Sequence, residues 1–277
     1  MDTIQWFPGH MAKAMRKMEE ALPMVDGVIL ILDARCPNAC INDKLVKMFS
    51  FKPVLYVLNK ADLADPVGLK RVTESFVKDK KQVVCIDAKS KKDISGLYGK
   101  IFELLKEKVE RNKAKGYFKP VRIMVAGIPN TGKSTIINAL VGGKKAQVGD
   151  KAGVTRSNQW VKLNELELLD TPGTMPPSFE DQVKAKHLAY VGCINDAIMD
   201  LSDLCLELIA ELTLLYPDRL KERYRLTDLD KTPIEIYEDI CQKRGFLIKG
   251  GDFDYERCAT AVIDDLRSGK LGRVIFE

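Results

Sequence analysis

One segment constrains the fold of this chain more than any other. Residues 127–135 read Gly-Ile-Pro-Asn-Thr-Gly-Lys-Ser-Thr, which matches the pattern G-x-x-x-x-G-K-[ST]. An apolar run predicts a strand over residues 121–126 before it, and residues 134–140 are spaced as a helix after it. In this context backbone N–H groups and the helix N-terminus form a cradle for phosphate. The segment predicts a nucleoside triphosphate site in an α/β fold, because a chance glycine turn does not explain both flanks.

The residues of this loop have separate expected contacts. Lys133 is expected to reach the β- and γ-phosphates and to assist catalysis, and the hydroxyl of Ser134 is a candidate ligand of Mg²⁺. The other loop residues expected at the nucleotide are Asn130, Thr131, Gly132 and Thr135.

Apolar runs alternate with amphipathic stretches from about residue 27 to residue 170. Strands are predicted at 27–33, 54–58, 83–86 and 121–126, with one or two more between 163 and 169. Helices are predicted between them at 45–49, 67–77 and 97–109, and residues 112–119 read as a basic surface connection. This alternation is typical of a parallel sheet with helices on its faces.

The pattern changes after residue 173. Prolines at positions 172, 176 and 177 mark a break. Helical spacing then dominates at 183–191, 201–215, 234–242 and 259–266. We therefore expect two domains, an α/β domain over residues 1–177 and an all-α domain over residues 178–277.

A candidate base-recognition motif, Asn59-Lys60-Ala61-Asp62, directly follows the strand predicted at 54–58. The carboxylate of Asp62 can accept two hydrogen bonds from the ring N–H and the amino group of guanine, a donor pair that adenine lacks. The stem of Lys60 can cover the face of the base. Asp87-Ala88-Lys89 follows the next predicted strand and offers further contacts to the same base. Alone the tetrapeptide is also a plausible turn, but after a strand and beside a phosphate-binding loop it favours guanine.

Two further segments complete a candidate site for Mg²⁺ and the γ-phosphate. Asp170-Thr171-Pro172-Gly173 ends a predicted strand, where Asp170 can hold a Mg²⁺-bound water and the N–H of Gly173 can bond the γ-phosphate. Thr155 lies between this segment and the phosphate-binding loop and is a candidate second hydroxyl ligand of Mg²⁺. Without the neighbouring motifs it would be an ordinary loop threonine.

These segments resemble the motif set of the translation-factor-related GTPases, but the base-recognition segments precede the phosphate segments. That order is similar to the circularly permuted GTPases. Further matches make the chain closely resemble the bacterial ribosome biogenesis GTPase A family over essentially its whole length: Trp6-Phe7-Pro8-Gly9-His10-Met11, Asp33-Ala34-Arg35, Gly250-Gly251 and residues 267–273. The resemblance implies a P-loop GTPase fold with circularly permuted motif order, followed by an all-α C-terminal domain.

The resemblance also implies a function. It implies a GTP-hydrolysing assembly factor in late maturation of the large ribosomal subunit, with nucleotide state coupled to binding of the subunit precursor and its rRNA. Because the permuted chain leaves Gly173 for the C-terminal domain, we expect nucleotide state to set the pose of that domain. Two alternatives stay open. One is a P-loop ATPase or kinase, which the motif at 59–62 opposes, and the other is an rRNA-binding scaffold in which GTP occupancy gates association with little catalysis.

The catalytic water lacks its usual partner in this sequence. Many such GTPases orient the water with a Gln directly after Asp-x-x-Gly, whereas this chain has Thr174-Met175 there. Hydrolysis is therefore expected to be slow alone and to be activated by the ribosomal subunit. His10 is the candidate to position water, with a structural role as the alternative. Asn130 resembles the asparagine that lets some relatives bind K⁺, and His187 is expected to be structural.

Charge is unevenly distributed along the chain. The net charge is +5, but residues 178–277 hold 14 Lys and Arg against 20 Asp and Glu, a balance of −6, and the rest of the chain balances to +11. The basic first part can meet RNA phosphates or be a solvated face. In the acidic part the clusters that can face RNA, or equally be solvated helix faces, are Arg219/Lys221/Arg223/Arg225 and Arg267/Lys270/Arg273. No DNA partner is expected.

The remaining features favour the cytoplasm. The seven cysteines include one close pair, Cys36 and Cys40, so we expect reduced thiols and no zinc site. The longest apolar run, residues 28–32, is too short to span a bilayer, and the N-terminus shows no signal-peptide or lipidation pattern. We therefore expect a cytoplasmic monomer without membrane association that binds GTP or GDP, Mg²⁺ and K⁺.

Overall fold

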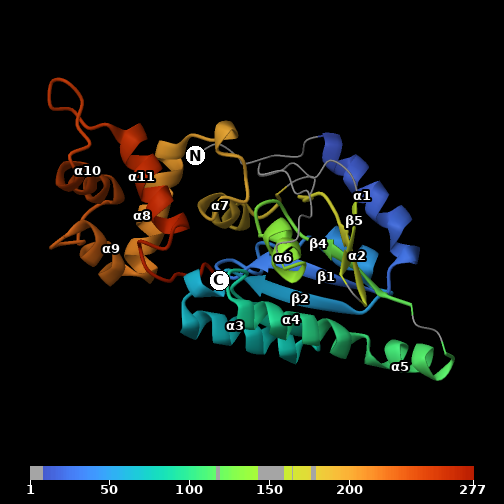
Figure 1. The fold of residues 1–277 in the computed structure, drawn as a ribbon. Helices are drawn as coiled ribbons and strands as arrows, with labels where there is room; N and C mark the ends of the chain where they lie inside the picture. Colours follow the sequence, from blue (N-terminus) through green and yellow to red (C-terminus); the bar gives the residue numbers. More distant parts are fainter. Residues whose placement is uncertain (1–8, 117–118, 143–158, 164, 176–178) are drawn as a thin grey trace. The chain divides into compact units, whose positions relative to one another are not determined.

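The computed structural model describes residues 9–116, 119–142, 159–163, 165–175 and 179–277 (Figure 1). Within these ranges the chain forms two compact units. Of the described residues, those from 9 to 175 form the sheet unit together with Ile275–Glu277, and Phe179–Val274 form the helical unit. Across the described ranges, no helix combines the length and the apolar character needed to cross a membrane.

The described part of the sheet unit contains one six-stranded sheet with the order β3-β2-β1-β4-β6-β5. The strands are β1 (Gly27–Asp33), β2 (Val54–Asn59), β3 (Gln82–Ile86), β4 (Val121–Ala126), β5 (Gln159–Leu163) and β6 (Leu166–Asp170). The helices are α1 (Gly9–Ala21), α2 (Asp43–Phe49), α3 (Pro66–Lys78), α4 (Lys91–Leu104), α5 (Lys106–Ala114) and α6 (Lys133–Leu140), with 3-10 turns at Leu22–Met24 and Ala61–Leu63 (Figure 1).

The strands β1 to β4 and β6 run parallel, as the alternation predicts, but β5 runs antiparallel to β6. The prediction of a parallel sheet is therefore wrong at this edge. Only residues 164 and 165 separate β5 from β6 in sequence. A parallel connection needs a crossover of about a dozen residues or more, so a link this short forces a hairpin.

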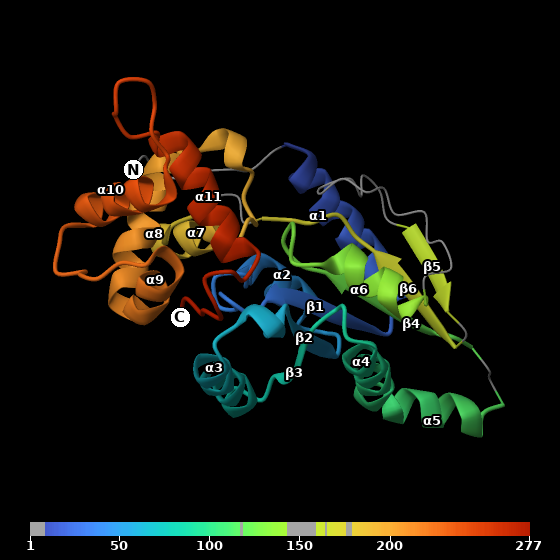
Figure 2. The same cartoon turned by 60° about the vertical axis from the view of Figure 1, so that its left-hand side comes forward.

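Apolar residues of the strands pack against helices on both faces of the sheet. Leu55 and Val57 of β2 share a buried cluster with Leu97 of α4 and Ile137 of α6. Tyr56, between them in β2, meets the ring of Phe76 of α3 edge-on, with ring centroids 5.4 Å apart. Because neighbouring residues of a strand point to opposite faces, α3 covers the face opposite α4 and α6 (Figure 2).

The helix predicted at 97–109 is two helices in the structure. Leu105 leaves helical geometry, with φ −110° and ψ 17°, and its side chain is buried in the core cluster beside the sheet. Leu105 continues the buried stripe of Ile94, Leu97 and Ile101, so the helical spacing of the sequence does not reveal the break. The next helix, α5, has no buried residue and continues to Ala114, so the connection predicted at 112–119 begins as helix.

The helical unit contains α7 (Gln182–Tyr190), α8 (Leu201–Leu215), α9 (Pro217–Tyr224), α10 (Pro233–Arg244) and α11 (Tyr255–Arg267), with a 3-10 turn at Asp196–Ile198. In α8, buried Leu204, Leu208 and Leu212 recur every four residues and form one apolar stripe. This helix packs against both α10 and α11. It is therefore the central helix of the unit.

Helix starts in this unit follow from the sequence. Asp200 caps α8, and Thr232 forms a capping box with Glu235 at the start of α10. The helices predicted from spacing do not include α9, which begins at Pro217. A proline is compatible with the first turn of a helix because the N–H that it lacks would have no partner there.

Candidate functional site

The carboxyl ends of the parallel strands meet at one edge of the sheet. The register pairs Asp33 of β1 with Asn59 of β2, and Val125 of β4 with Asp170 of β6. Strands β1 and β4 are neighbours in the sheet. After β1 the chain continues to β2 on one side, and after β4 it continues to β5 and β6 on the other side. In open α/β sheets, ligands bind at such a switch point. We call this the nucleotide edge.

The phosphate-binding loop joins β4 to α6 at this edge. Gly127 has φ +146° and Gly132 has φ +97°, both in the region that favours glycine. A Cβ at Gly127 would collide with the carbonyl oxygen of Ile31, and one at Gly132 would collide with the side-chain amide of Asn59. Space and backbone conformation therefore both require glycine at these positions.

Lys133, the first residue of α6, is buried, and its Nζ donates to the carbonyl oxygen of Ile128 at 2.7 Å. Gly173 lies beside it. A Cβ at Gly173 would lie 2.7 Å from the backbone N of Pro129 and 3.0 Å from Nζ of Lys133. The segment that follows β6 therefore packs directly on the phosphate-binding loop, which leaves no room for a larger residue than glycine.

The side chain of Asn59 ties the phosphate-binding loop to the base-recognition segments. Its Nδ2 donates to the carbonyl oxygen of Thr131 at 2.8 Å, and its Oδ1 accepts from the backbone N of Ala88 at 3.2 Å. Asp87 accepts through Oδ1 from the backbone N of Lys89 at 2.8 Å and so closes the turn after β3. One buried side chain thus holds three segments of the chain in place.

Lys60 makes a second link to the phosphate-binding loop. Its Nζ donates to the carbonyl oxygen of Asn130 at 2.9 Å and lies 2.9 Å from Oδ2 of Asp33. Both Lys60 and Asn130 have left-handed backbone conformations, with φ +62° and +61°. Asparagine tolerates this region better than most residues do, which gives Asn130 a structural reason for its identity.

Asp33 is the centre of a buried ion cluster. It is fully buried and accepts from N, Nε and Nη2 of Arg35 at 3.0, 2.9 and 2.8 Å. Burial alone would raise the pKa of Asp33, but the charges and hydrogen bonds of Arg35 and Lys60 outweigh it and hold the pKa well below its ordinary value. The carboxylate is therefore ionised throughout the physiological range.

The last residues of the chain also pack on this part of the sheet unit. The backbone N of Phe276 donates to the carbonyl oxygen of Arg35 at 2.7 Å, and Glu277 accepts from the backbone N of Asn38 at 2.8 Å. Before the structure, the segment 33–35 has only a family resemblance to mark it, and residues 275–277 have no predicted role. The position of Asp33 at the end of a predicted strand could have indicated a role for the segment 33–35. No local sequence pattern indicates a role for residues 275–277.

The remaining predicted nucleotide residues that the structure describes lie on β6, on α6 and in the turn after β2. Asp170, the last residue of β6, is buried, and Ser134 in the first turn of α6 is half-buried. Asp62 is half-buried in the 3-10 turn after β2. Thr135 is exposed on α6. Thr155 lies outside the described residues.

The predicted water-positioning residue, His10, lies in the first turn of α1, and its side chain is outside the described part of the structure. Its neighbour Met11 is buried and accepts through Sδ from the backbone N of Met175 at 3.4 Å. The start of α1 therefore lies against the segment that follows Gly173.

The second histidine, His187, lies within the helical unit. Its Nε2 forms a hydrogen bond with Oε1 of Glu211 at 2.7 Å.

No group of three or more His, Cys, Asp or Glu side chains is arranged to hold a metal among the described residues. Cys36 and Cys40 contact each other, with their sulfurs 4.0 Å apart, and both are buried. A Mg²⁺ site of the P-loop type needs no such group, because one carboxylate, hydroxyls and substrate phosphates supply its oxygen ligands.

Known proteins resemble this chain over nearly its whole length. The protein family described as 50S ribosome-binding GTPase matches residues 122–245. Ribosome biogenesis GTPase A of Priestia megaterium is 42% identical over 282 residues, covering 99% of this chain and 96% of the relative. The protein of that name from Thermotoga maritima is 33% identical over 276 residues, covering 99% of this chain and 94% of the relative. The crystal structure of GNP-bound YlqF from T. maritima has a TM-score of 0.65 at 28% identity, covering 96% of this chain and 97% of that chain.

The position of the family match bears on the order of the motifs. The match begins within β4, directly before the phosphate-binding loop. Both base-recognition segments, residues 59–62 and 87–89, therefore precede it in the chain. Together with the full-length similarity, this order confirms the circular permutation predicted from the sequence.

Proposed function

The chain belongs to the ribosome biogenesis GTPase A family, and from that premise we propose that it is a GTP-hydrolysing assembly factor in late maturation of the large ribosomal subunit. Its nucleotide state controls binding to the subunit precursor and its rRNA, and it acts in the cytoplasm as a monomer. The names of the relatives support a role in ribosome biogenesis. The basic balance of +11 before residue 178 supports contact with RNA phosphates.

One observation carries the choice of GTP. Asn59 and Lys60, from the guanine motif, each donate a hydrogen bond to a carbonyl of the phosphate-binding loop, at 2.8 and 2.9 Å. Base recognition and phosphate binding therefore belong to one preorganised site rather than to two separate turns. This coupling opposes an ATPase or kinase, because Asp62, two residues after Lys60 in the same motif, is the carboxylate proposed to select guanine.

The residues of the site support phosphoryl transfer to water. Lys133 is proposed to stabilise charge on the β- and γ-phosphates, and the N–H of Gly173 is proposed to bond the γ-phosphate. The close approach of the two residues supports this, because a Cβ at Gly173 would lie 3.0 Å from Nζ of Lys133. The hydroxyl of Ser134, the carboxylate of Asp170 and the hydroxyl of Thr155 form a hard oxygen set that fits Mg²⁺. When bound, Mg²⁺ neutralises charge that develops on the phosphates.

Two further groups are proposed to assist hydrolysis. His10 positions the attacking water, which is supported by the contact of its neighbour Met11 with Met175, two residues beyond Gly173. Asn130 helps to hold K⁺ beside the phosphates. In sequence, the segment after Gly173 leads to the helical unit. Because the γ-phosphate is proposed to hold Gly173, its loss can change how tightly this segment is held.

The test is GTP hydrolysis with and without large ribosomal subunits, in potassium and in sodium buffer. A slow basal rate that the subunit raises strongly supports the proposal, and a further gain in potassium supports the role of Asn130. Tight GTP binding without stimulation in either buffer contradicts it and favours an rRNA-binding scaffold.

A further inference from the structure

Residues Ile275–Glu277, which we call the tail, belong to the sheet unit, whereas the residues directly before them in sequence belong to the helical unit. Phe276 is buried, with 1% of its surface exposed, and its backbone N donates to the carbonyl oxygen of Arg35 at 2.7 Å. The side-chain carboxylate of Glu277 accepts from the backbone N of Asn38 at 2.8 Å and from the side-chain amide of the same residue. The tail is therefore fixed to the turn that follows β1.

Helix α3 leaves space for the tail at one glycine. Gly68 lies in the first turn of α3, and its backbone N donates to Oδ2 of Asp65 at 2.9 Å. A Cβ at this position would collide with Cγ2 of Ile275, which is itself buried. Gly68 is not in the left-handed region, so its backbone does not demand glycine, and alanine is the more favourable residue within a helix. The glycine is therefore explained by the space that Ile275 occupies.

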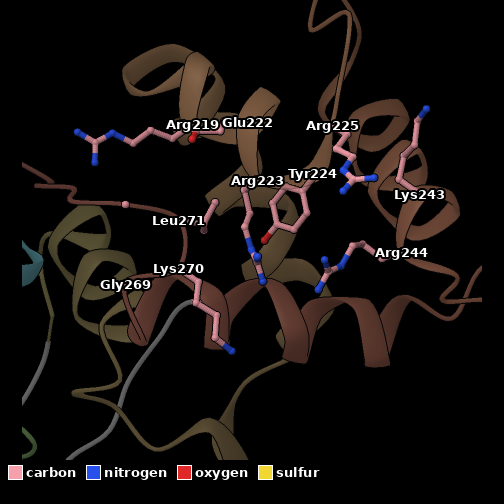
Figure 3. Close-up of a pocket in the computed structure, with 11 residues that line it drawn as sticks. Arg219, Glu222, Arg223, Tyr224, Arg225, Lys243, Arg244, Gly269, Lys270 and Leu271 are labelled. Carbon is pink, nitrogen blue, oxygen red and sulfur yellow. The ribbon is translucent and has the colours of Figure 1, made fainter.

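The segment directly before the tail is anchored in the helical unit. Leu271 is buried, and its backbone N donates to the carbonyl oxygen of Asp265 on α11 at 3.2 Å. Residues 269–272 line a pocket together with residues of α9 and α10 (Figure 3). We call it the basic pocket for the cations on its lining: Arg219, Arg223, Arg225, Lys243, Arg244 and Lys270. The tail therefore continues a segment that is itself held in place.

Two buried residues connect the tail to the guanine motif. Arg35, whose carbonyl oxygen binds Phe276, donates to the carboxylate of Asp33 through its backbone N, Nε and Nη2 at 3.0, 2.9 and 2.8 Å. Oδ2 of Asp33 in turn lies 2.9 Å from Nζ of Lys60. Both Asp33 and Arg35 are buried, so these charged hydrogen bonds are sheltered from water and fix the side chains that they join. Only these two residues separate the tail from Lys60.

We propose that Phe276, seated by Ile275, is a positioning residue for guanine binding, an inference that rests on the guanine site of the proposed function. The tail holds the turn that contains Arg35. Arg35 holds Asp33, and Asp33 holds the stem of Lys60 where it covers the base. Because GTP and GDP share the base, the tail strengthens the binding of both nucleotides equally. Hydrolysis depends on the γ-phosphate and is independent of the tail once GTP is bound.

Three variants of the full chain test the inference. In Gly68→Ala the new Cβ displaces Ile275, so affinity for GDP and for a non-hydrolysable GTP analogue is expected to fall by the same factor, about tenfold. The single-turnover rate at saturating GTP is expected to stay within about twofold. Gly68→Ala combined with Ile275→Ala removes the collision, so most of the lost affinity is expected to return. Gly96→Ala is the matched control, because a Cβ there meets open space on α4, and both affinities should be unchanged.

Amide exchange of the unsubstituted chain is a second measurement, which does not depend on the folding of a variant. Coupling between two sites is reciprocal, so a guanine nucleotide must hold the tail as strongly as the tail holds the nucleotide. The N–H of Phe276, which bonds Arg35, is expected to exchange about tenfold more slowly with GDP or the GTP analogue than without nucleotide. ADP is expected to have no effect.

The outcomes distinguish the inference from the proposed function. A double variant as weak as Gly68→Ala overturns the inference, because the loss then comes from α3 itself. Unchanged affinity in Gly68→Ala, a loss for GTP without a loss for GDP, or exchange of Phe276 that nucleotide does not change also overturns it. In each of these cases the guanine site of the proposed function stands. A chain that binds neither GDP nor the GTP analogue contradicts the proposed function, and the inference falls with it.

Discussion

Nζ of Lys60 lies 2.9 Å from Oδ2 of Asp33, a carboxylate with no exposed surface at the end of β1. The same Nζ donates to a carbonyl of the phosphate-binding loop at 2.9 Å. Lys60 therefore joins two segments of the nucleotide edge before any base is bound. The stem that is expected to cover guanine is held in place by a buried charge.

Replacing Asp33 with Asn is expected to destabilise the fold by about 3 kcal/mol, because it leaves the charges of Arg35 and Lys60 without their buried partner. GTP affinity should fall as well, since Lys60 loses its fixed position. Chemical denaturation and nucleotide titration measure the two effects. Asp79→Asn is the matched control: its pair with Lys81 is exposed, so its effect should be below about 0.5 kcal/mol. Equal effects of the two variants would contradict this interpretation.

The same carboxylate predicts a pH dependence. The pKa of Asp33 is lowered in the folded state, mainly by Arg35 and Lys60 against the effect of burial. Its contribution to stability is therefore fully present above the unfolded pKa, at about pH 4, and is lost as pH falls through the folded pKa. The difference in unfolding free energy between the unsubstituted chain and Asp33→Asn should be constant from about pH 5 to 7 and shrink below about pH 4. A difference in unfolding free energy that grows as the pH falls would contradict the prediction.

Gly173→Ala is expected to slow GTP hydrolysis by about tenfold to a hundredfold. The new Cβ would lie 2.7 Å from the backbone N of Pro129, so the segment must move away from the phosphate-binding loop. Single-turnover hydrolysis measures this step. Gly99→Ala is the control, because a Cβ there meets open space within α4 and should raise stability by about 0.5 to 1 kcal/mol with hydrolysis unchanged. Normal hydrolysis by Gly173→Ala would argue against a role in γ-phosphate contact.

Asp62→Asn tests the base assignment. Loss of the charged acceptor is expected to lower GTP affinity by about a hundredfold. The amide can instead donate to the 2-oxo group of xanthine, so affinity for xanthosine triphosphate should rise. Competition binding with the two nucleotides measures the exchange. Retained preference for GTP would place the base elsewhere.

Motifs and strand positions were largely predictable from the sequence. The phosphate-binding loop, its strand and its helix lie where the pattern places them, at β4 and α6. The guanine motif begins at Asn59, the last residue of β2, one residue inside a strand that was predicted to end at residue 58. These features depend on local spacing, and local spacing can be read from one sequence.

Features that depend on tertiary packing were missed. The break at Leu105 falls on a residue that continues the buried stripe of α4, so the helical spacing around it gives no sign of the break. The antiparallel direction of β5 depends on a connection whose shortness appears only when both strand ends are known. The hydrogen bond from Phe276 to Arg35 joins positions far apart in sequence. The basic pocket likewise forms only when α9, α10 and the turn after α11 come together.

The most direct test of nucleotide-controlled subunit binding is sedimentation of the chain with large ribosomal subunits in the presence of a non-hydrolysable GTP analogue or of GDP. We predict that the chain sediments with the subunits when the analogue is bound and remains mostly in the supernatant with GDP. Equal sedimentation in both nucleotide states would contradict the proposed switch and leave a ribosome-binding protein whose nucleotide does not control association.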